Sequence, residues 1–325
     1  MIKNKKKFHK IPIINISSLF NNSSIKKTNS VINQIHDAVK EYGFFIVTNH
    51  GIDLNLLNSI ENLSNKFFSL NNNIKISLSP KKWNKSNKNI YRGYFPSSVN
   101  GKEGIDIGDP QIKKSMIKIC NKLEKNTNID HLIPMWSKII DKYYEKIFNL
   151  GIILFKSILK NYNLNDKFFI HAFQRPYTLS TLRFNYYPKQ EKPVEISKND
   201  GVPLGCETHV DSGIFTILYQ DKKGGLQIQH RKLDTWINVP YRKNSLIINT
   251  GLALEYLTGS HFKATNHRVL FNKSKRLSIP FFFEPSYYFQ LDPSRLGIKM
   301  QSNFFKPTYD YFLNNSLKKF IEYQR

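Results

Sequence analysis

The chain has 325 residues, of which 40% are hydrophobic and 14% aromatic, so it can bury the core of one large domain or two ordinary ones. These values exclude a chain that is disordered throughout. No apolar run approaches the roughly 20 residues needed to cross a bilayer, which excludes an integral membrane protein. With only two cysteines, Cys120 and Cys206, the chain is not a disulfide scaffold, and a reducing compartment is expected.

The formal net charge of +25 arises from 49 Lys and Arg residues against 24 Asp and Glu residues. Such a charge is often seen in proteins that bind nucleic acids. Here, however, most cations are Lys, they are spread along the chain, and they accompany abundant Asn, as in the run 71–73. We therefore interpret the charge as a compositional bias and not as a sign of a nucleic-acid partner. The Lys-rich segment 1–10 lacks the apolar stretch of a signal peptide, which predicts a cytoplasmic location.

Helical and strand signals alternate over the first half of the chain. In chain order, the patterns predict a strand over 11–16, a helix over 29–42, a short buried strand over 44–47, a helix capped by Asp53, irregular structure over 71–110 and a long amphipathic helix over 133–159.

Short segments rich in β-branched and aromatic residues follow, separated by turn signals. They predict strands over 182–187, 214–219, 226–229, 245–248, 268–271 and 277–283, and a closing helix over 309–323. Glycines 224 and 225 are expected to form a tight turn. The predicted fold class is therefore mainly β with flanking helices, and the spacing favours an antiparallel sandwich or jelly roll.

Three side chains in the β region have the chemistry of a metal site. His209 and Asp211 are separated by one residue, so in an extended segment both point the same way. Alone, this pair reads more readily as a surface His beside a turn. His267, at the start of a later predicted strand, completes a set of two His and one carboxylate, which is the facial triad of non-haem Fe(II) oxygenases.

A candidate anion site follows nine residues after His267. Arg276 and Ser278 alternate on one predicted strand and therefore face the same side. A guanidinium and a hydroxyl together suit the binding of a carboxylate. Because the next residues, 279–283, are apolar, Arg276 is expected inside the fold and not on a solvated surface.

These motifs, in this order, resemble the isopenicillin N synthase-like family of Fe(II)/2-oxoglutarate-dependent dioxygenases. The resemblance covers residues 11 to about 285, and its further segments are 11–14, 42–52, 91–94, 102–108 and 183–188. It implies a double-stranded β-helix, or jelly-roll, core. It also implies four regions: an N-terminal dioxygenase-type region over 1–130, a supporting helix over 131–170, the jelly-roll core over 171–290 and a C-terminal helical segment over 291–325.

The resemblance further implies a role for each matching residue. His209, Asp211 and His267 would bind Fe(II), and Arg276 and Ser278 would bind 2-oxoglutarate. Tyr187 would add a hydrogen bond to this cosubstrate, and Asn185 would line the same site. Molecular oxygen would be consumed, with ascorbate as a possible further cofactor. Many members carry an acidic residue where this chain has Leu252. The side-chain hydrogen bond by which such a residue would orient a metal ligand is therefore not expected here.

Strand alternation adds Leu218 and Phe282 as candidate walls of a substrate pocket, although plain core packing explains them equally well. Three further His residues are not expected to bind metal: His50 is expected to be structural, and His230 and His261 solvated. Cys206 is excluded because a thiolate is not expected in this triad.

The predicted function is oxidation, most simply hydroxylation, of a small organic substrate coupled to decarboxylation of 2-oxoglutarate. Three different functions stay open beside it. They are an iron-dependent oxidase of the same family that does not use 2-oxoglutarate, a nucleic-acid demethylase on the same fold, and a non-catalytic jelly-roll binding protein. No membrane association is expected, and the sequence indicates neither the substrate nor the oligomeric state.

Overall fold

The computed structural model describes residues 10–20, 23–113 and 123–323. The prediction for the Lys-rich N-terminal segment, apart from Lys10, and any statement on Cys120 lie outside these residues. None of the helices in the described ranges combines the length and apolar character needed to span a bilayer.

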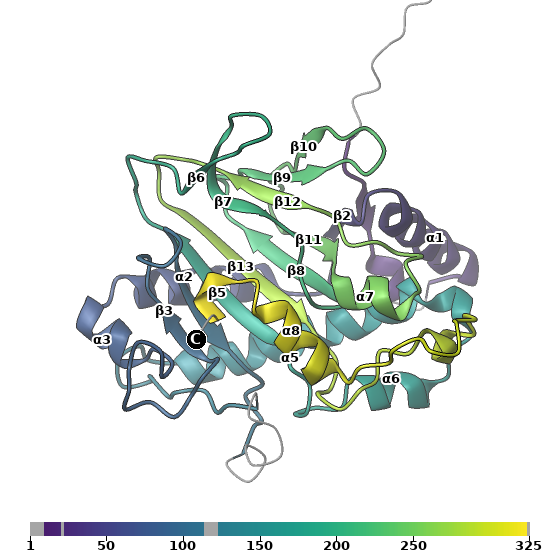
Figure 1. Cartoon of the computed structure of the whole chain (residues 1–325), viewed down its shortest axis with the longest axis horizontal. Coiled ribbons are helices and arrows are strands. Elements are labelled where there is room, and N and C mark those ends of the chain that lie inside the picture. The colour runs from purple at the N-terminus through teal and green to yellow at the C-terminus, as the bar shows by residue number, and fades with distance from the viewer. Residues whose placement is uncertain (1–9, 21–22, 114–122, 324–325) are drawn as a thin grey trace, which may run out of the picture.

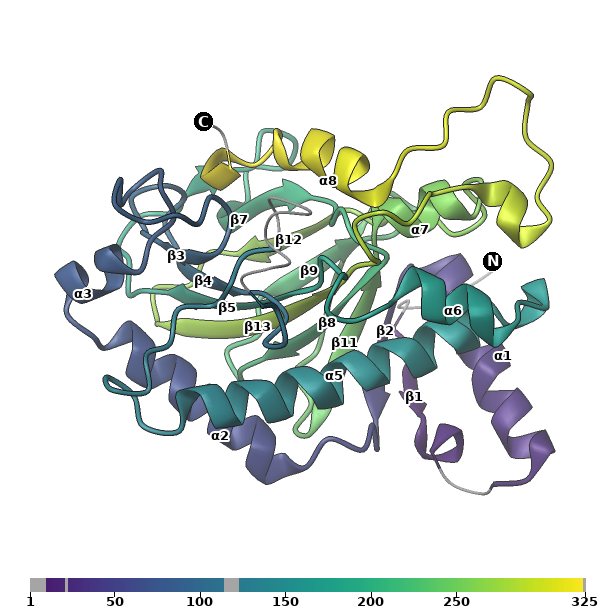
Figure 2. The same ribbon diagram turned by 90° about the horizontal axis from the view of Figure 1, so that it is seen from below.

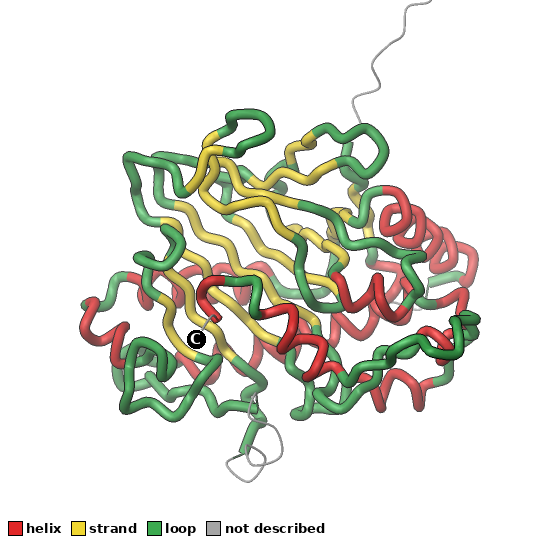
Figure 3. The backbone as a smooth tube through the Cα atoms, in the orientation of Figure 1, coloured by secondary structure: helices red, strands yellow, loops and turns green. Residues whose placement is uncertain are grey.

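Two sheets form the centre of the molecule (Figure 1), and helices and loops surround them (Figure 3). The large sheet has the order β1 (Ile13–Asn15), β2 (Phe44–Thr48), β11 (Ser245–Thr250), β8 (Phe215–Gln220), β13 (Arg276–Phe283), β5 (Thr181–Tyr187), β4 (Glu103–Ile107) and β3 (Gly93–Phe95). The small sheet has the order β10 (Trp236–Asn238), β9 (Leu226–Gln229), β12 (His267–Leu270), β7 (Pro203–His209) and β6 (Glu195–Ile196). All pairs except β1–β2 are antiparallel, and the predicted fold class is confirmed.

The helices are α1 (Ile25–Glu41), α2 (Leu54–Phe68), α3 (Asn72–Ser77), α5 (Trp136–Ile158), α6 (Asp166–Ala172), α7 (Leu252–Leu257) and α8 (Tyr309–Leu317). Figure 2 shows α5 running along the large sheet with α2 beside it, while α8 lies on the opposite side of the molecule. Short 3-10 turns occur at Ser17–Leu19, Lys160–Tyr162, Pro293–Leu296 and Ile321–Tyr323. The last of these follows α8 and forms the end of the described chain.

The N-terminal expectations hold for α2, which Asp53 caps, and for the amphipathic helix α5. The expectation of irregular structure over 71–110 is wrong, because α3, β3 and β4 lie there. Strand β4 contains two acids, which makes it read as a surface segment. Both acids are buried and paired: Glu103 with Lys75, and Asp106 with Arg183. Pairing across elements is what makes such burial tolerable, and a local sequence pattern cannot reveal it.

Helix α5 approaches β13 closely at Gly151. A Cβ added at Gly151 would lie 2.5 Å from a ring carbon of Phe283. The Phe283 ring stacks against Phe173, with centroids 4.2 Å apart, and against Phe215, at 4.9 Å. These neighbours prevent the Phe283 ring from moving aside. Gly151 thus fixes the distance between the helix and the sheet that carries the site described below.

Replacing Gly151 with Ala should destabilise the protein, although Ala is normally the better helix former by about 1 kcal/mol. Overpacking a fixed core typically costs about 1–3 kcal/mol, which outweighs the gain in propensity. Thermal unfolding of Gly151→Ala should therefore show a lowered Tm. The matched control is Asn149→Ala, an exposed position of the same helix, which should leave the Tm unchanged or raise it. An equal response of the two variants would contradict the packing argument.

Candidate active site

The register of two strands in the small sheet brings two histidines together. His209 ends β7, His267 begins β12, and the two are direct partners in the antiparallel pair. Their rings lie 4.2 Å apart, centroid to centroid. Asp211 follows two residues after β7, and its Oδ1 lies 3.8 Å from His209 Nε2 and 3.7 Å from His267 Nε2. One ligand atom from each residue falls within 4.8 Å of the other two, so the three can hold one metal ion.

Hydrogen bonds fix the orientation of all three side chains. His209 Nδ1 lies 2.8 Å from the Glu207 carbonyl, and His267 Nδ1 lies 3.1 Å from the Thr265 carbonyl. Because a carbonyl only accepts, each Nδ1 carries the proton and each Nε2 presents a lone pair to the shared space. Asp211 Oδ2 accepts hydrogen bonds from Thr216 and Asn249, at 2.5 and 2.6 Å, which leaves Oδ1 facing the imidazoles.

The three charges in this group act on one another. Burial would raise the pKa of Asp211, but the two imidazoles and the bonds from Thr216 and Asn249 outweigh it and lower this pKa. Burial together with the nearby His209 lowers the pKa of His267 to about 4. Burial also opposes charge on His209, but Cys206 and Asp211 outweigh it and raise that pKa to about 9. The carboxylate is thus ionised, as a metal ligand must be, whereas His209 would lose one proton on binding a metal, because only a neutral imidazole presents the Nε2 lone pair.

A β-bulge lies beside these three side chains. His267 and Val269 of β12 pair with His209 and Cys206 of β7, so β7 has one extra residue between the two pairs. In a regular strand, residues three apart point to opposite faces. The bulge instead allows Cys206 and His209 to line the same cavity. Bulges commonly re-aim side chains in this way, and the sequence gives no direct signal for one.

Arg276, Ser278 and Tyr187 form a second group across the cavity. Arg276 is 3% exposed, and it donates from Nε to the Gly224 carbonyl at 2.6 Å and from Nη1 to Ser278 Oγ at 3.2 Å. Its guanidinium lies 4.8 Å from the centre of the Tyr187 ring. No salt bridge joins Arg276 to a carboxylate within the described ranges. A buried cation of this kind needs an anion, and its remaining N–H groups can bind one.

The pairing of β13 with β5 explains why these residues meet. Arg276 pairs with Tyr187, and Ser278 pairs with Asn185. Asn185 lines the cavity, and its Oδ1 is buried with no hydrogen-bond partner among the described residues. This oxygen is therefore an acceptor available to a bound molecule.

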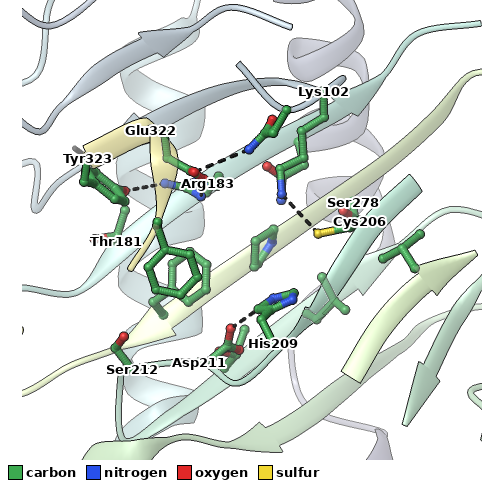
Figure 4. Close-up of a pocket in the computed structure, with 18 of the residues that line it drawn as sticks. Lys102, Thr181, Arg183, Cys206, His209, Asp211, Ser212, Ser278, Glu322 and Tyr323 are labelled. Carbon is green, nitrogen blue, oxygen red and sulfur yellow. Dashed lines mark hydrogen bonds and ion pairs between the residues drawn. The ribbon is translucent and has the colours of Figure 1, made fainter. Parts of the chain in front are cut away.

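A cavity of about 430 Å³ joins the two groups, a volume within the roughly 300–1,000 Å³ of small-molecule sites. Figure 4 shows the side chains that surround it. Leu218 and Phe282 line it, as do Thr216, Ser278 and Pro280 on the same faces of β8 and β13. The alternation read from the sequence therefore placed these side chains toward the interior.

The C-terminal segment supplies another wall, which the sequence analysis did not single out. Phe320, Glu322 and Tyr323 all line the cavity, and the Phe320 ring lies 6.3 Å from that of His209. Arg183 ties this segment to the core through Glu322, at 3.5 Å, and through the hydroxyl of Tyr323. Arg183 also holds Asp106 with two hydrogen bonds, of 2.5 and 2.8 Å. Arg183 lies two residues before Asn185 on β5, so the same alternation could have found it.

The remaining sequence predictions have mixed outcomes. His50 is buried and accepts a hydrogen bond from the Ile52 amide, and His261 is exposed, as expected. His230 was expected to be solvated, but it is 3% exposed and packs against Tyr42, so that prediction is wrong. Leu252 has no acidic side chain to support Asp211, yet its backbone N–H donates to the Asp211 carbonyl at 2.9 Å.

Comparison with known proteins agrees with this geometry. Residues 178–285 match the model of the 2OG-Fe(II) oxygenase superfamily, and residues 11–135 match that of the N-terminal region of a non-haem dioxygenase in morphine synthesis. A 1-aminocyclopropane-1-carboxylate oxidase from Dictyostelium discoideum is 32% identical over 317 residues, covering 85% of this chain and 82% of the relative. The chain belongs to the 2OG-Fe(II) oxygenase superfamily.

Further relatives of this oxygenase support the assignment. Isopenicillin N synthase from Streptomyces jumonjinensis is 26% identical, with 87% of each chain covered. A full-length Neurospora crassa protein, crystallised with alpha-KG and 5-formyluracil, has the same fold, with a TM-score of 0.80 at 20% identity. The match covers 96% of this chain and 97% of the Neurospora protein. The expected resemblance to the isopenicillin N synthase-like family is confirmed, as are iron, 2-oxoglutarate and oxygen as the family's reagents.

A buried acid of the oxygenase lies in the same cavity. Glu284 follows β13 and is 6% exposed. Burial raises the pKa of its carboxyl to about 8, against the opposing charge of Arg92. The carboxyl is therefore mostly protonated at neutral pH, whereas in the unfolded chain its pKa would lie near 4.5.

This shift predicts a pH-dependent stability. The folded state holds the proton on Glu284 more tightly than the unfolded chain does. The contribution of this proton to the free energy of unfolding is therefore complete below about pH 4.5 and is lost as the pH rises through 8. The loss is at most about 1.4 kcal/mol per pH unit. Glu284→Gln stays neutral and avoids it. Urea midpoints measured from pH 5 to 9 should therefore show the variant gaining on the wild type as the pH rises. If the urea midpoints of the two proteins changed equally with pH, the prediction would be contradicted.

Proposed function

We propose that His209, Asp211 and His267 are the protein ligands of Fe(II). The donor set fits this ion: two imidazole Nε2 atoms and one carboxylate oxygen leave positions for exogenous ligands. The protein prepares each ligand, since the carbonyl groups of Glu207 and Thr265 fix the imidazole tautomers and Thr216 and Asn249 hold the carboxylate. Such outer contacts orient ligands and strengthen metal binding.

We also propose that Arg276 and Ser278 bind the distal carboxylate of 2-oxoglutarate. The support is the buried guanidinium, which has no carboxylate partner among the described residues although it is held in place by Gly224 and Ser278. Tyr187, stacked against Arg276, flanks the same position, and the unpartnered Asn185 oxygen is a further contact point. A carboxylate placed here would replace the missing counter-charge.

The reaction that fits this site is hydroxylation of a small organic substrate. When bound, ferrous iron with 2-oxoglutarate and O2 supplies the oxidising chemistry. The cosubstrate is converted to succinate and CO2, and one oxygen atom passes to the substrate. The chain orients the reactants and limits the access of water: Leu218, Phe282 and Phe320 give the cavity apolar surfaces. The observation that carries the proposal is the meeting of the three ligands and the unpaired Arg276 in one cavity.

The similarity to two named relatives favours a second candidate function, that of an oxidase. An oxidase of this superfamily that does not consume 2-oxoglutarate would share the same three metal ligands, and both a 1-aminocyclopropane-1-carboxylate oxidase and isopenicillin N synthase are similar to this chain. Stoichiometric release of succinate on oxygen uptake supports the hydroxylase. Oxygen uptake without succinate supports the oxidase.

A nucleic-acid demethylase and a non-catalytic binding protein receive less support. The relatives named above act, by their names, on small molecules, which agrees with a cavity of about 430 Å³ and not with a nucleic-acid demethylase. A binding protein without catalysis would not need an oriented metal-ligand set. We place the enzyme in the cytoplasm, away from membranes, where the buried thiol of Cys206 would stay reduced.

Replacing His267 with Ala should weaken Fe(II) binding by at least about 100-fold, because loss of a ligand costs more than the 10- to 100-fold typical of outer contacts. Anaerobic titration of Fe(II), followed by calorimetry, measures this directly. His261→Ala, at an exposed position outside the cavity, is the matched control and should bind as the wild type does. Equal affinities of all three proteins would remove His267 from the ligand set.

Replacing Arg276 with Ala should weaken 2-oxoglutarate binding roughly 10- to 100-fold, as expected for lost charged hydrogen bonds worth about 1.5–3 kcal/mol. Fe(II) affinity should stay unchanged, since Arg276 does not contact the three ligands. The visible absorption band that forms when 2-oxoglutarate is added to the anaerobic Fe(II) protein reports the dissociation constant. The exposed Arg242→Ala is the control. Unaltered 2-oxoglutarate affinity in Arg276→Ala would place the cosubstrate elsewhere.

A further inference from the structure

Lys102 is a cation of the cavity that the mechanism above does not use. It lies immediately before β4 and after Gly101, whose φ of 72° turns the backbone into the strand. Its side chain is partly buried and lines the cavity. Figure 4 shows the ammonium pointing to Cys206, with 3.4 Å between Nζ and Sγ. Cys206 in turn interacts with His209, so Lys102 is separated from a proposed metal ligand by a single side chain.

The ammonium group of Lys102 contacts the sulfur of Cys206 but has no carboxylate partner among the described residues. Burial opposes charge on the Cys206 thiol, but Lys102 and His209 outweigh it and lower its pKa to about 6, so the sulfur can share the charge of Lys102. No carboxylate forms a salt bridge with Lys102 in the part of the chain that the structure describes. Its sequence neighbour Glu103 is paired with Lys75 at 2.6 Å. An ammonium has three N–H donors, so two remain for a bound molecule.

The other buried cations of the cavity already have partners, and Lys319, which also lines the cavity, is exposed. Arg183 binds the carboxylates of Asp106 and Glu322. Arg92 donates to the Thr181 hydroxyl, at 2.5 Å, and to the Leu179 carbonyl, at 3.1 Å. Arg276 is assigned above to the cosubstrate. Lys102, by contrast, has the sulfur of Cys206 as its single hydrogen-bond partner among the described residues.

The proposed iron site does not compensate this charge either. A ferrous ion, the Asp211 carboxylate, a doubly charged 2-oxoglutarate and the Arg276 guanidinium are together electrically neutral. These groups therefore supply no counter-charge to Lys102. A carboxylate bound at its two remaining N–H groups would supply one, and burial makes that interaction worth more than it would be in water. The substrate is the remaining molecule that enters this cavity.

We propose that Lys102 binds a carboxylate of the substrate, which is a small organic acid with an apolar body. The apolar part would lie against Leu218, Phe282 and Phe320, which line the same cavity. The charge-assisted bond to Lys102 would anchor the acid and set which carbon faces the metal. This inference rests on the proposed function, because it takes the metal and cosubstrate sites as assigned above.

The test uses the full chain loaded with Mn(II), which prevents turnover, and with 2-oxoglutarate. Calorimetry then measures the binding of hexanoate, phenylacetate and 3-phenylpropionate, each against its primary amide. In the wild type, at least one acid should bind tenfold or more tightly than its amide. In Lys102→Gln this preference should disappear, while the affinity for Mn(II) and 2-oxoglutarate is retained. Removing the ammonium leaves no buried carboxylate unpaired, so the variant is expected to fold.

Two control variants identify the residue responsible. Lys189→Gln changes an exposed lysine outside the cavity and should keep the preference. Lys319→Gln changes an exposed lysine that also lines the cavity and should keep it too. Loss of the preference in Lys319→Gln, with Lys102→Gln unaffected, would overturn the assignment to Lys102.

The remaining outcomes separate the ways in which the inference can fail. If wild-type protein binds neither Mn(II) nor 2-oxoglutarate, the proposed function fails first. If it binds both but no acid more tightly than its amide, the inference about Lys102 fails alone. If Lys102→Gln weakens 2-oxoglutarate binding tenfold and leaves the preference for acids intact, the carboxylate at Lys102 belongs to the cosubstrate, and the inference is again overturned.

Discussion

The pairing of β7 with β12 is the constraint on which the site depends. It places the last residue of one strand, His209, opposite the first residue of the other, His267. A slip of one residue would turn an entire strand face away from the cavity, and the two imidazoles would no longer share a space with Asp211. The neighbouring strands reinforce this register. Thr216 pairs with Asn249 across β8 and β11, so both reach the same oxygen of Asp211.

The buried charges of this protein are of two kinds. Some are neutralised within the fold: Glu103 by Lys75, and Asp106 by Arg183. These pairs join β4 to α3 and β5, and they keep the charges satisfied whether or not a ligand is present. Arg276 and Lys102 instead point into the cavity without a carboxylate partner among the described residues. In the proposed function, anions that enter the cavity would balance these two charges, so the stability of the pocket and the binding of its ligands would be linked.

Much of this arrangement could be predicted from the sequence, because it follows from short motifs and strand alternation. His209 with Asp211, and Arg276 with Ser278, each lie two apart, and that spacing suffices to predict a common face. Contacts between residues that are distant in the sequence could not be predicted. Glu103 and Asp106 made β4 look like a surface loop, because their partners Lys75 and Arg183 are distant in sequence. The bulge that turns Cys206 into the cavity has no local signal, and the burial of His230 depends on contacts with Tyr42.

The participation of the C-terminal turn in the cavity wall has an evolutionary consequence. Glu322 and Tyr323 are connected to the core through Arg183, Asp106 and Asn100. Neither they nor Phe320 belong to the strands that carry the proposed metal ligands. Mutations in this turn can therefore reshape one side of the pocket without disturbing the register of β7 and β12. Substitutions in this turn could therefore change which molecules the protein accepts during evolution, while the residues proposed to bind the metal and the cosubstrate stay the same.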